Sequence, residues 1–334
     1  MKKCAIVILN YNGEQVLPVF LPSVLKFSQH DVWVIDNAST DSSMNLLKKD
    51  FPGIHLIELS SNFGYAGGYN WGLEELKGKY EYFILLNSDV EVTEDWDIEL
   101  VNWMGQNPEY ASIQPKILSW QEKGKFDYAG AGGGFLDALG YPYCRGRIWN
   151  VLESDHRQYD DSLQVDWASG ACMVIRSEDF FRQEGFDAHF FAHMEEIDLC
   201  WRLRVAGRKI GYLGRVRVFH QGGATLSRSS PGKLYLNIRN NLGMLYKNLP
   251  SGRFWLVFTV KILLEFASAL GYLISGKPEL AKSVAKGYRD FIQTRSLYTK
   301  TKNRGPEQGI PRSGPVNFIF WHFFVLGKKR FSNL

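Results

Sequence analysis

Short apolar runs alternate with helix-like stretches over the first ninety residues, and this alternation constrains the fold more than any other feature. The runs are rich in Val, Ile and Leu and cover residues 4–9, 32–35, 54–59 and 82–86. The stretches with helical spacing cover residues 15–27, 42–51 and 66–76. Continuous apolar strands alternating with helices are typical of a parallel sheet buried on both faces. The sequence therefore predicts an α/β fold with a Rossmann-like, mostly parallel sheet and flanking helices.

Polar residues stand at the end of each of the four apolar runs. In chain order they are Asn10 and Asn12, then Asp36, then Asn62 with Gly64, and finally Asn87, Ser88 and Asp89. Ligands of open α/β sheets bind outside the carboxyl ends of the strands. We therefore expect these residues to converge on one edge of the sheet and to form a binding site.

Two acids in this series have specific chemical uses. Asp36 can accept hydrogen bonds from a base edge or a ribose hydroxyl, whereas the alternative is an N-cap cluster for the next helix. Asp89 offers the oxygen ligand that Mg²⁺ or Mn²⁺ prefers, and its alternative is a turn-forming role. The glycine-containing turn after Asn62 opens a helix whose N-terminus favours an anion, although a tight turn without a ligand explains it equally well.

A second group of polar residues lies far along the chain. Glu195, Glu196 and Asp198 begin a stretch with helical spacing, where carboxylates gain from the helix dipole or one of them acts as a general base. His220 ends an apolar run and is either a structural histidine or a metal ligand. The surrounding segments are predicted as a flexible glycine-rich loop at 130–134, a loop and strand at 167–175, and two short strands at 210–213 and 216–219.

Other features exclude several classes of protein. No GxGxxG follows the first strand and no GxxxxGK[ST] occurs in the sequence, which excludes nicotinamide dehydrogenases and P-loop enzymes. The four cysteines lie far apart without a CxxC pair, which argues against disulfide frameworks and zinc knuckles and fits a reducing compartment. The apolar run at 4–9 is too short for a signal peptide.

The C-terminal region differs in charge from the rest. Residues 277–334 contain 12 Lys and Arg and 3 Asp and Glu, a net charge of +9, while the remainder has 27 basic and 32 acidic residues, or −5. The apolar run at 254–274 carries Lys261 and Glu265, so a helix lying in a membrane interface explains it better than a spanning helix. The run at 316–326 precedes three basic residues and suggests an anchor on an anionic membrane. The alternative is that both runs pack on the main domain; no nucleic-acid motif is present.

Taken in order, these motifs resemble family 2 glycosyltransferases. The resemblance rests on five segments and covers roughly residues 4–225. Within the family, the sequence is most similar to the branch of rhamnosyltransferase-like enzymes of bacterial surface polysaccharide assembly. The segments are VILNYNG at 7–13, VIDNASTD at 34–41, NFGYAGG at 62–68, LNSD at 86–89 and FFAHMEEIDL at 190–199.

The resemblance implies a GT-A fold, a nucleotide-sugar donor (UDP- or dTDP-linked), a divalent cation (Mg²⁺ or Mn²⁺), and transfer with inversion to a glycan or lipid-linked glycan. It implies that Asp89 and His220 hold the metal and that Glu196, or alternatively Glu195, is the catalytic base. The residues implied at the donor are Asn10, Asn12, Asp36, Asn62, Gly64, Asn87 and Ser88. Those implied at the sugar and acceptor pocket are Trp167, Ser169, Gly170 and Asp198.

The sequence departs from the family pattern at two positions. The metal motif usually reads Asp-x-Asp, whereas Asn87 replaces its first acid, and the base position often reads Asp, whereas Glu196 stands here. The QxxRW motif of processive members is absent, so we expect one sugar per encounter. A catalytically inactive scaffold of the same fold is the rival hypothesis, and a nucleotidyltransferase is disfavoured because no basic, glycine-rich loop follows the first strand.

These inferences divide the chain into two parts. We expect a glycosyltransferase domain at 1–227 and a helical, basic and aromatic region at 228–334. The protein is expected in the cytoplasm, in peripheral contact with the inner face of the cytoplasmic membrane, without nucleic acid as a partner.

Overall fold

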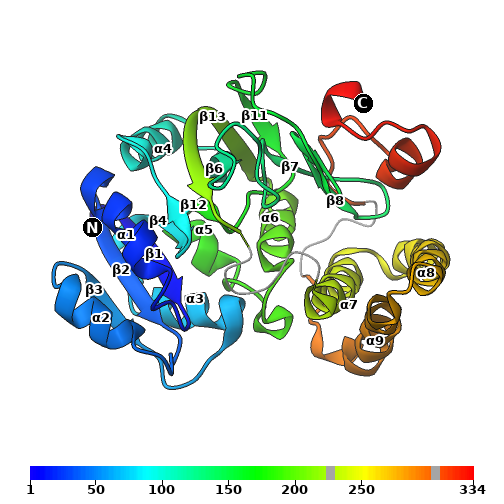
Figure 1. Ribbon diagram of the computed structural model, residues 1–334, viewed down its shortest axis with the longest axis horizontal. Helices are drawn as coiled ribbons and strands as arrows, with labels where there is room; N and C mark the ends of the chain where they lie inside the picture. The colour runs from blue at the N-terminus through cyan, green and yellow to red at the C-terminus, as the bar shows by residue number, and fades with distance from the viewer. Residues whose placement is uncertain (223–229, 302–308) are drawn as a thin grey trace.

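A computed structural model describes residues 1–222, 230–301 and 309–334 as a central sheet with helices on both faces, a smaller sheet and a bundle of three helices (Figure 1). The central sheet contains β1 (Lys2–Asn10), β2 (Asp31–Asp36), β3 (His55–Glu58), β4 (Tyr80–Asn87), β5 (Val90–Glu91), β6 (Tyr110–Ser119), β11 (Ser162–Val165), β12 (Cys172–Arg176) and β13 (Lys209–His220). The smaller sheet contains β7 (Gly134–Leu136), β8 (Pro142–Cys144), β9 (Arg147–Ile148) and β10 (Val151–Leu152).

The helices follow the predicted alternation. Those of the N-terminal part are α1 (Leu17–Phe27), α2 (Ser43–Asp50), α3 (Gly64–Glu74), α4 (Trp96–Gln106), α5 (Ser177–Arg182) and α6 (Glu195–Val205). The C-terminal bundle consists of α7 (Pro231–Asn248), α8 (Ser251–Ile274) and α9 (Pro278–Thr294). The four strands and three helices predicted in the first ninety residues are confirmed within a few residues of their bounds.

The sheet is mixed, with a parallel half built from the predicted strands. Its order is β11-β13-β6-β12-β4-β1-β2-β3, and β5 pairs with β13. Strands β4, β1, β2 and β3 run parallel, whereas β12 is antiparallel to both of its neighbours, β4 and β6. The α/β fold class is therefore confirmed, and β12 inserts between the parallel half and the β6–β13 pair.

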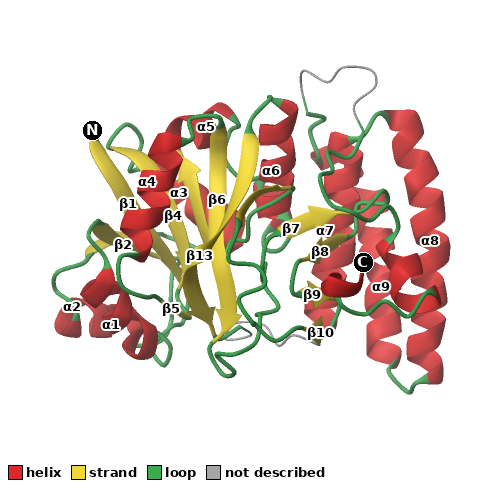
Figure 2. Ribbon diagram, turned by 90° about the horizontal axis from the view of Figure 1, so that it is seen from above, coloured by secondary structure: helices red, strands yellow, loops and turns green. Residues whose placement is uncertain are grey.

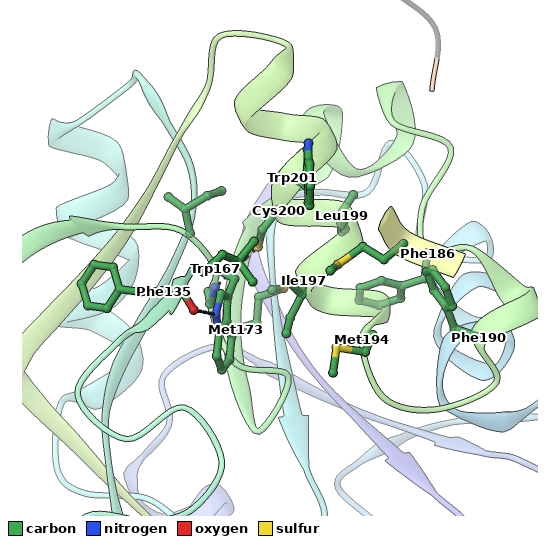
Figure 3. Close-up of a cluster of buried hydrophobic side chains, with 14 of the residues drawn as sticks. Phe135, Trp167, Met173, Phe186, Phe190, Met194, Ile197, Leu199, Cys200 and Trp201 are labelled. Carbon is green, nitrogen blue, oxygen red and sulfur yellow. Dashed lines mark hydrogen bonds between the residues drawn. The ribbon is translucent and has the colours of Figure 1, made fainter. Parts of the chain in front are cut away.

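Alternate side chains of the buried strands supply two cores. In β1, Ile6 and Ile8 pack with α1, α2 and α4 on one face, whereas Ala5 and Val7 pack with α3, α5 and α6 on the other. This period-2 alternation is what a strand covered on both sides requires. The second core continues beneath α6, where Phe186, Met194 and Ile197 belong to one cluster (Figure 3).

Two segment predictions were wrong. The strands predicted at 210–213 and 216–219 form one strand, β13, whose register against β6 shifts between Leu213 and Arg217. Gly214 and Arg215, which lie between the two predicted strands, are accommodated in this irregularity. The glycine-rich segment at 130–134 was predicted as a flexible loop, yet it is packed inside the protein, where a side chain on Gly134 would strike the Trp167 ring.

The C-terminal bundle stands beside the smaller sheet, and α8 lies at its outer side (Figure 2). Lys261 of α8 points inward, is 1% exposed and pairs with Glu265 at 3.0 Å. The expectation that these charges lie in a membrane interface is therefore wrong, because they face the protein. The opposite face is apolar and exposed, with Leu256 at 68% and Leu263 at 69%.

By length and composition, α8 is the one helix in the described part of the chain that could cross a membrane. The run at 316–326 packs partly on the domain. Val316, Ile319 and Phe323 are buried, whereas Trp321 and Phe324 are exposed. The predicted domain boundary after residue 227 falls within 223–229, which lies outside the described residues.

Candidate functional site

A cavity of about 900 Å³ begins at the carboxyl ends of β1 and β4 and reaches the inner faces of α7 and α8. It brings together most of the predicted site residues from distant parts of the chain. Those that line it are Asn62, Gly64, Asn87, Ser88, Asp89, Trp167, Ser169, Gly170, Glu195, Glu196 and His220. Four predicted residues do not line it: Asn10, Asn12, Asp36 and Asp198.

Strand pairing places Asp89 beside His220. The chain turns after β4, and β5 then pairs with the end of β13, with Val90 opposite His220. The Nε2 atom of His220 lies 3.2 Å from Oδ1 of Asp89 and 3.4 Å from Nδ2 of Asn87. The backbone NH of Gly222 donates to the other Asp89 oxygen at 3.2 Å. The residues at both strand ends therefore form one polar cluster.

Asp127 orients the His220 ring and was not predicted. Its Oδ1 atom lies 2.8 Å from Nδ1 of His220, and it is held next to β6 by a hydrogen bond from its NH to Ile117. Burial opposes charge on the imidazole, but Asp89 and Asp127 outweigh burial and raise the pKa of His220 to about 10. Burial alone would raise the pKa of Asp89. The neighbouring His220 lowers it by more, so the pKa of Asp89 lies below its usual value.

The separation of Asp89 and His220 is that of an ion pair, and it also lies near the spacing of two neighbouring metal ligands. Two adjacent ligands of an octahedral Mg²⁺, each about 2.1 Å from the ion, lie about 3.0 Å apart. The observed 3.2 Å is close to that separation. No group of three His, Cys, Asp or Glu side chains suited to a metal occurs within 1–222, 230–301 and 309–334. The pair would thus need further ligands such as substrate phosphates.

Glu195 and Glu196 begin α6 and both face the cavity. Burial raises the pKa of Glu196 to about 7. Burial, followed by the charge of Glu196, raises the pKa of Glu195 well above its usual value. One side-chain oxygen of each glutamate is buried without a hydrogen-bond partner among the described residues. Near neutral pH, Glu196 titrates, and the same burial disfavours a negative charge on Glu195.

A strained loop holds the first turn of α6 in place. Phe191, His193 and Met194 all have positive φ angles, of 62°, 70° and 75°. The Asn240 side chain of α7 donates to the carbonyls of Phe190, Ala192 and His193 at 2.7–2.9 Å. Strained backbone persists only where its surroundings fix it, and such fixed segments occur at functional sites.

The same loop closes the N-terminus of α3. The Phe191 carbonyl accepts hydrogen bonds from the NH groups of Tyr65 and Ala66. Gly64, with φ +70°, permits this approach, because a Cβ there would lie 2.5 Å from the Phe191 ring. Asn62 accepts from the Gly64 NH at 2.9 Å. The turn after β3 is thereby fixed next to the two glutamates.

The loops after β1 and β2 are joined by a hydrogen-bond network that contains Asn10, Asn12 and Asp36. None of these three residues lines the cavity. Asp36 accepts from Asn10 at 2.9 Å and from the NH and hydroxyl of Ser39 at 3.0 and 2.6 Å. Asn12 accepts from the Thr40 NH at 2.8 Å. The side chains chiefly fasten the β1 and β2 loops to each other. Asn37, the neighbour of Asp36, lines the cavity in their place.

Trp167, Ser169 and Gly170 form the floor of the cavity between the two polar clusters. The Trp167 indole NH donates to the Phe135 carbonyl at 3.0 Å (Figure 3). The Gly170 carbonyl accepts from the Tyr65 hydroxyl at 2.8 Å. These bonds fix the floor relative to α3 and to the smaller sheet.

Asp198 was expected in the acceptor pocket, and the structure places it elsewhere. It is fully buried and bound to Arg202 at 2.8 Å, Lys247 at 2.9 Å and Asn248 at 2.6 Å. Its carboxylate is therefore committed to joining α6 to α7. On a helix it lies two residues beyond Glu196, which turns it away from the cavity.

Sequence reasoning missed other cavity residues. Tyr128 and Arg147 lie in the irregular segment between β6 and β11, and Lys261 and Glu265 were attributed to a membrane surface. His193 also lines the cavity, where burial lowers its pKa to about 4. Of these residues, only His193 could have been suspected from the sequence, because it lies two residues before Glu195.

Comparisons with known proteins identify the family of the chain. The sequence pattern of the family described as "Glycosyl transferase family 2" matches residues 5–180. The low-salt glycan biosynthesis hexosyltransferase Agl10 of Haloferax volcanii is 29% identical over 243 residues, covering 71% of this chain and 73% of the relative. The N-acetylglucosaminyl-diphospho-decaprenol L-rhamnosyltransferase of Mycobacterium tuberculosis is 26% identical over 247 residues, covering 69% and 79%.

A solved structure shares the fold. The crystal structure of GalNAc-T7 with UDP, GalNAc and Mn²⁺ superposes with a TM-score of 0.58 at 15% identity, covering 92% of this chain and 59% of that chain. The mixed sheet with flanking helices is therefore the GT-A fold.

Proposed function

The chain belongs to glycosyl transferase family 2, and we propose that it transfers one sugar per encounter, with inversion, from a UDP- or dTDP-sugar to a lipid-linked glycan. The proposed setting is surface polysaccharide assembly. The observation that carries the proposal is the single cavity, which holds the Asp89–His220 pair and Glu196 and then continues to the C-terminal helices. It thus offers a place for a donor, a base and an acceptor.

Asp89 and His220 would hold a divalent cation, Mg²⁺ or Mn²⁺. Their 3.2 Å separation and the Asp127 contact to the far side of the ring suit a ligand pair of this kind. When bound, such an ion would neutralise charge on the departing nucleoside diphosphate. Asn87 supplies an amide where the family pattern has an acid, so the site carries one carboxylate fewer.

Glu196 would act as the base. Its carboxylate accepts the proton of the acceptor hydroxyl, the hydroxyl oxygen forms a bond to the anomeric carbon, and the bond from that carbon to the diphosphate oxygen breaks. One displacement inverts the configuration. A base whose pKa lies near 7 combines sufficient basicity with deprotonation at neutral pH. Glu195, whose pKa burial raises well above its usual value, would donate a hydrogen bond to a substrate oxygen when protonated.

The C-terminal helices would complete the acceptor side and contact the membrane. We propose that the chain divides near 227/228 into a donor domain and a membrane-proximal helical region. Support comes from the exposed apolar face of α8 and from the name of the mycobacterial relative, whose acceptor is a diphospholipid-linked sugar. The enzyme would work at the cytoplasmic face of the membrane.

Release of nucleoside diphosphate tests the proposal. The full chain is incubated with UDP-, dTDP- and GDP-sugars and a polyprenyl-diphosphate-linked N-acetylhexosamine, with Mn²⁺, Mg²⁺ or EDTA. We expect cation-dependent transfer from one nucleotide class and a product whose anomeric configuration, determined by NMR, is inverted. Retention of configuration would overturn the mechanism. Nucleotide binding without turnover for any pair would favour the inactive scaffold.

A further inference from the structure

Arg147, the first residue of β9, is a buried cation in the wall of the cavity. Its side chain lines the cavity and the residue is only 7% exposed. The guanidinium lies over the Tyr128 ring, 4.3 Å from its centroid. Among the described residues, its hydrogen bonds go to the Trp149 carbonyl and the Cys144 sulfur, both at 3.3 Å, and Nε is buried without a partner. These bonds use only two of the five N–H donors of arginine.

No carboxylate in the described residues forms an ion pair with Arg147. Asp127 attracts it from a longer distance, but that carboxylate is bound to His220. The contrast with Arg145, two residues earlier, is direct, because Arg145 is equally buried and pairs with Asp161 at 2.5 Å. Arg202 likewise pairs with Asp198 at 2.8 Å. Among these buried arginines, only Arg147 faces the cavity and lacks a carboxylate.

An unpaired buried cation is costly, and a residue of similar size such as Met would avoid that cost. A guanidinium kept in a cavity wall with unused donors is suited to an anion that arrives with a ligand. Its planar fork matches phosphate oxygens, and an aromatic ring beneath it holds the plane in place. A second cation lies nearby, since the Lys233 ammonium is 5.1 Å from the centroid of the same Tyr128 ring.

We propose that Arg147, stacked on Tyr128, is a phosphate-binding residue that contacts a diphosphate oxygen of a substrate. The inference rests on the proposed function, which supplies two diphosphates, one in the nucleotide-sugar and one in the lipid-linked acceptor. Tyr128 follows Asp127, which holds His220, so Arg147 lies on the path from the metal pair to the helical side of the cavity. Arg147 is thus placed to bind the diphosphate of either substrate.

The test compares Arg147→Met and Arg147→Lys with the matched control Arg145→Met. Calorimetry with Mn²⁺ measures the affinity for the nucleoside diphosphate and for inorganic pyrophosphate, and steady-state kinetics give the acceptor KM. We expect Arg147→Met to weaken one of these by about 10- to 100-fold, with partial recovery in Arg147→Lys. A loss in nucleotide affinity assigns the donor diphosphate, whereas a loss confined to pyrophosphate and to acceptor KM assigns the acceptor.

Thermal unfolding separates this role from a structural one. Arg147→Met should unfold at the temperature of the wild type or higher, because an unpaired buried charge is removed. Arg145→Met should unfold at a lower temperature, because Asp161 loses its partner. A destabilised Arg147→Met that retains wild-type affinity for nucleotide, pyrophosphate and acceptor would overturn the proposal. The calorimetric affinities for nucleoside diphosphate and pyrophosphate require no turnover. They therefore test the role of Arg147 even if the proposed transfer reaction is not observed.

Discussion

At the scale of single residues, burial raises the pKa values of two adjacent glutamates. Glu195 is 4% exposed, and burial together with the charge of Glu196 raises its pKa well above the usual value. Glu196 is partly exposed and burial brings its pKa to about 7. Pairs of acids whose pKa values are driven apart by their surroundings are typical of acid–base catalysis. The sequence alone left the base undecided between them.

The pH dependence of turnover follows from the pKa of Glu196. A base acts only when deprotonated, so kcat/KM should rise about tenfold per pH unit below pH 7 and level off above about pH 8. Glu195→Gln should retain this rise, because Glu196 is still present as the titrating base. Initial rates at substrate concentrations below KM, from pH 5.5 to 9, check both statements. A rate that falls as the pH rises through 7 would contradict the assignment of Glu196.

Single-residue positions could be predicted from the sequence where a strand end fixes them. Asp89 and His220 stand at predicted strand ends and meet because β5 pairs with β13, while their role as metal ligands stays a prediction. Asp36 occupies its predicted strand end, but its carboxylate is turned to Asn10 and Ser39, and no sequence pattern reveals such a rotamer. Asp127 and Arg147 lie in irregular segments without periodicity, so only the folded chain shows their contacts.

At the scale of elements, α6 is held against α7 by a buried charge network. Asp198 is bound by Arg202, Lys247 and Asn248. Although burial raises the pKa of Asp198, Lys247 and Arg202 hold it below its usual value. The stabilisation is therefore present at neutral pH and is lost only as the pH falls through the lowered pKa.

Asp198→Asn should loosen the element that carries Glu196. Removing one partner of a buried ion pair typically lowers the free energy of unfolding by about 3–5 kcal/mol. The matched control is Glu178→Gln, which breaks the exposed i,i+4 pair with Arg182 and should cost under about 1 kcal/mol. Urea denaturation of both variants measures the difference. Equal stability of the two variants would show that the network does not join α6 to α7.

Element prediction succeeded where periodicity was strong and failed where it was interrupted. The β–α alternation of residues 1–90 was predicted because buried parallel strands leave a continuous apolar signal. β13 was predicted as two strands because Gly214 and Arg215 interrupt its apolar run. Lys261 and Glu265 were expected in a membrane interface because they interrupt an apolar run. In the structure they face the protein interior, where Tyr141 donates a hydrogen bond to Glu265 at 2.8 Å.

At the scale of the whole molecule, one cavity extends from the proposed donor site to the inner face of α8, whose outer face is the proposed membrane surface. The outer face of α8 exposes Leu256, Leu263 and Leu270, seven residues apart and thus on one stripe. The C-terminal segment adds exposed Trp321 and Phe324. Apolar surface of this kind, next to basic residues, suits the interface of an anionic bilayer.

Leu256→Glu combined with Leu263→Glu should reduce binding to vesicles that contain anionic lipid by at least about 10-fold, because two exposed leucines no longer enter the interface. Vesicle sedimentation measures the bound fraction. Val19→Glu is the control, because Val19 is also exposed but lies on α1, away from the bundle. Turnover of a water-soluble acceptor should be the same in all three proteins. Unchanged vesicle binding of the double variant would exclude α8 as the contact surface.

The proposed mechanism requires that Glu196 removes a proton in a sugar transfer whose donor binds elsewhere in the cavity. Turnover and donor affinity in Glu196→Gln, measured beside Glu195→Gln, test this requirement. Glu196→Gln should lose about 10²- to 10⁴-fold in kcat, while the dissociation constant of the nucleotide-sugar stays within about threefold of wild type. Turnover of Glu196→Gln near the wild-type rate would show that Glu196 is not the base.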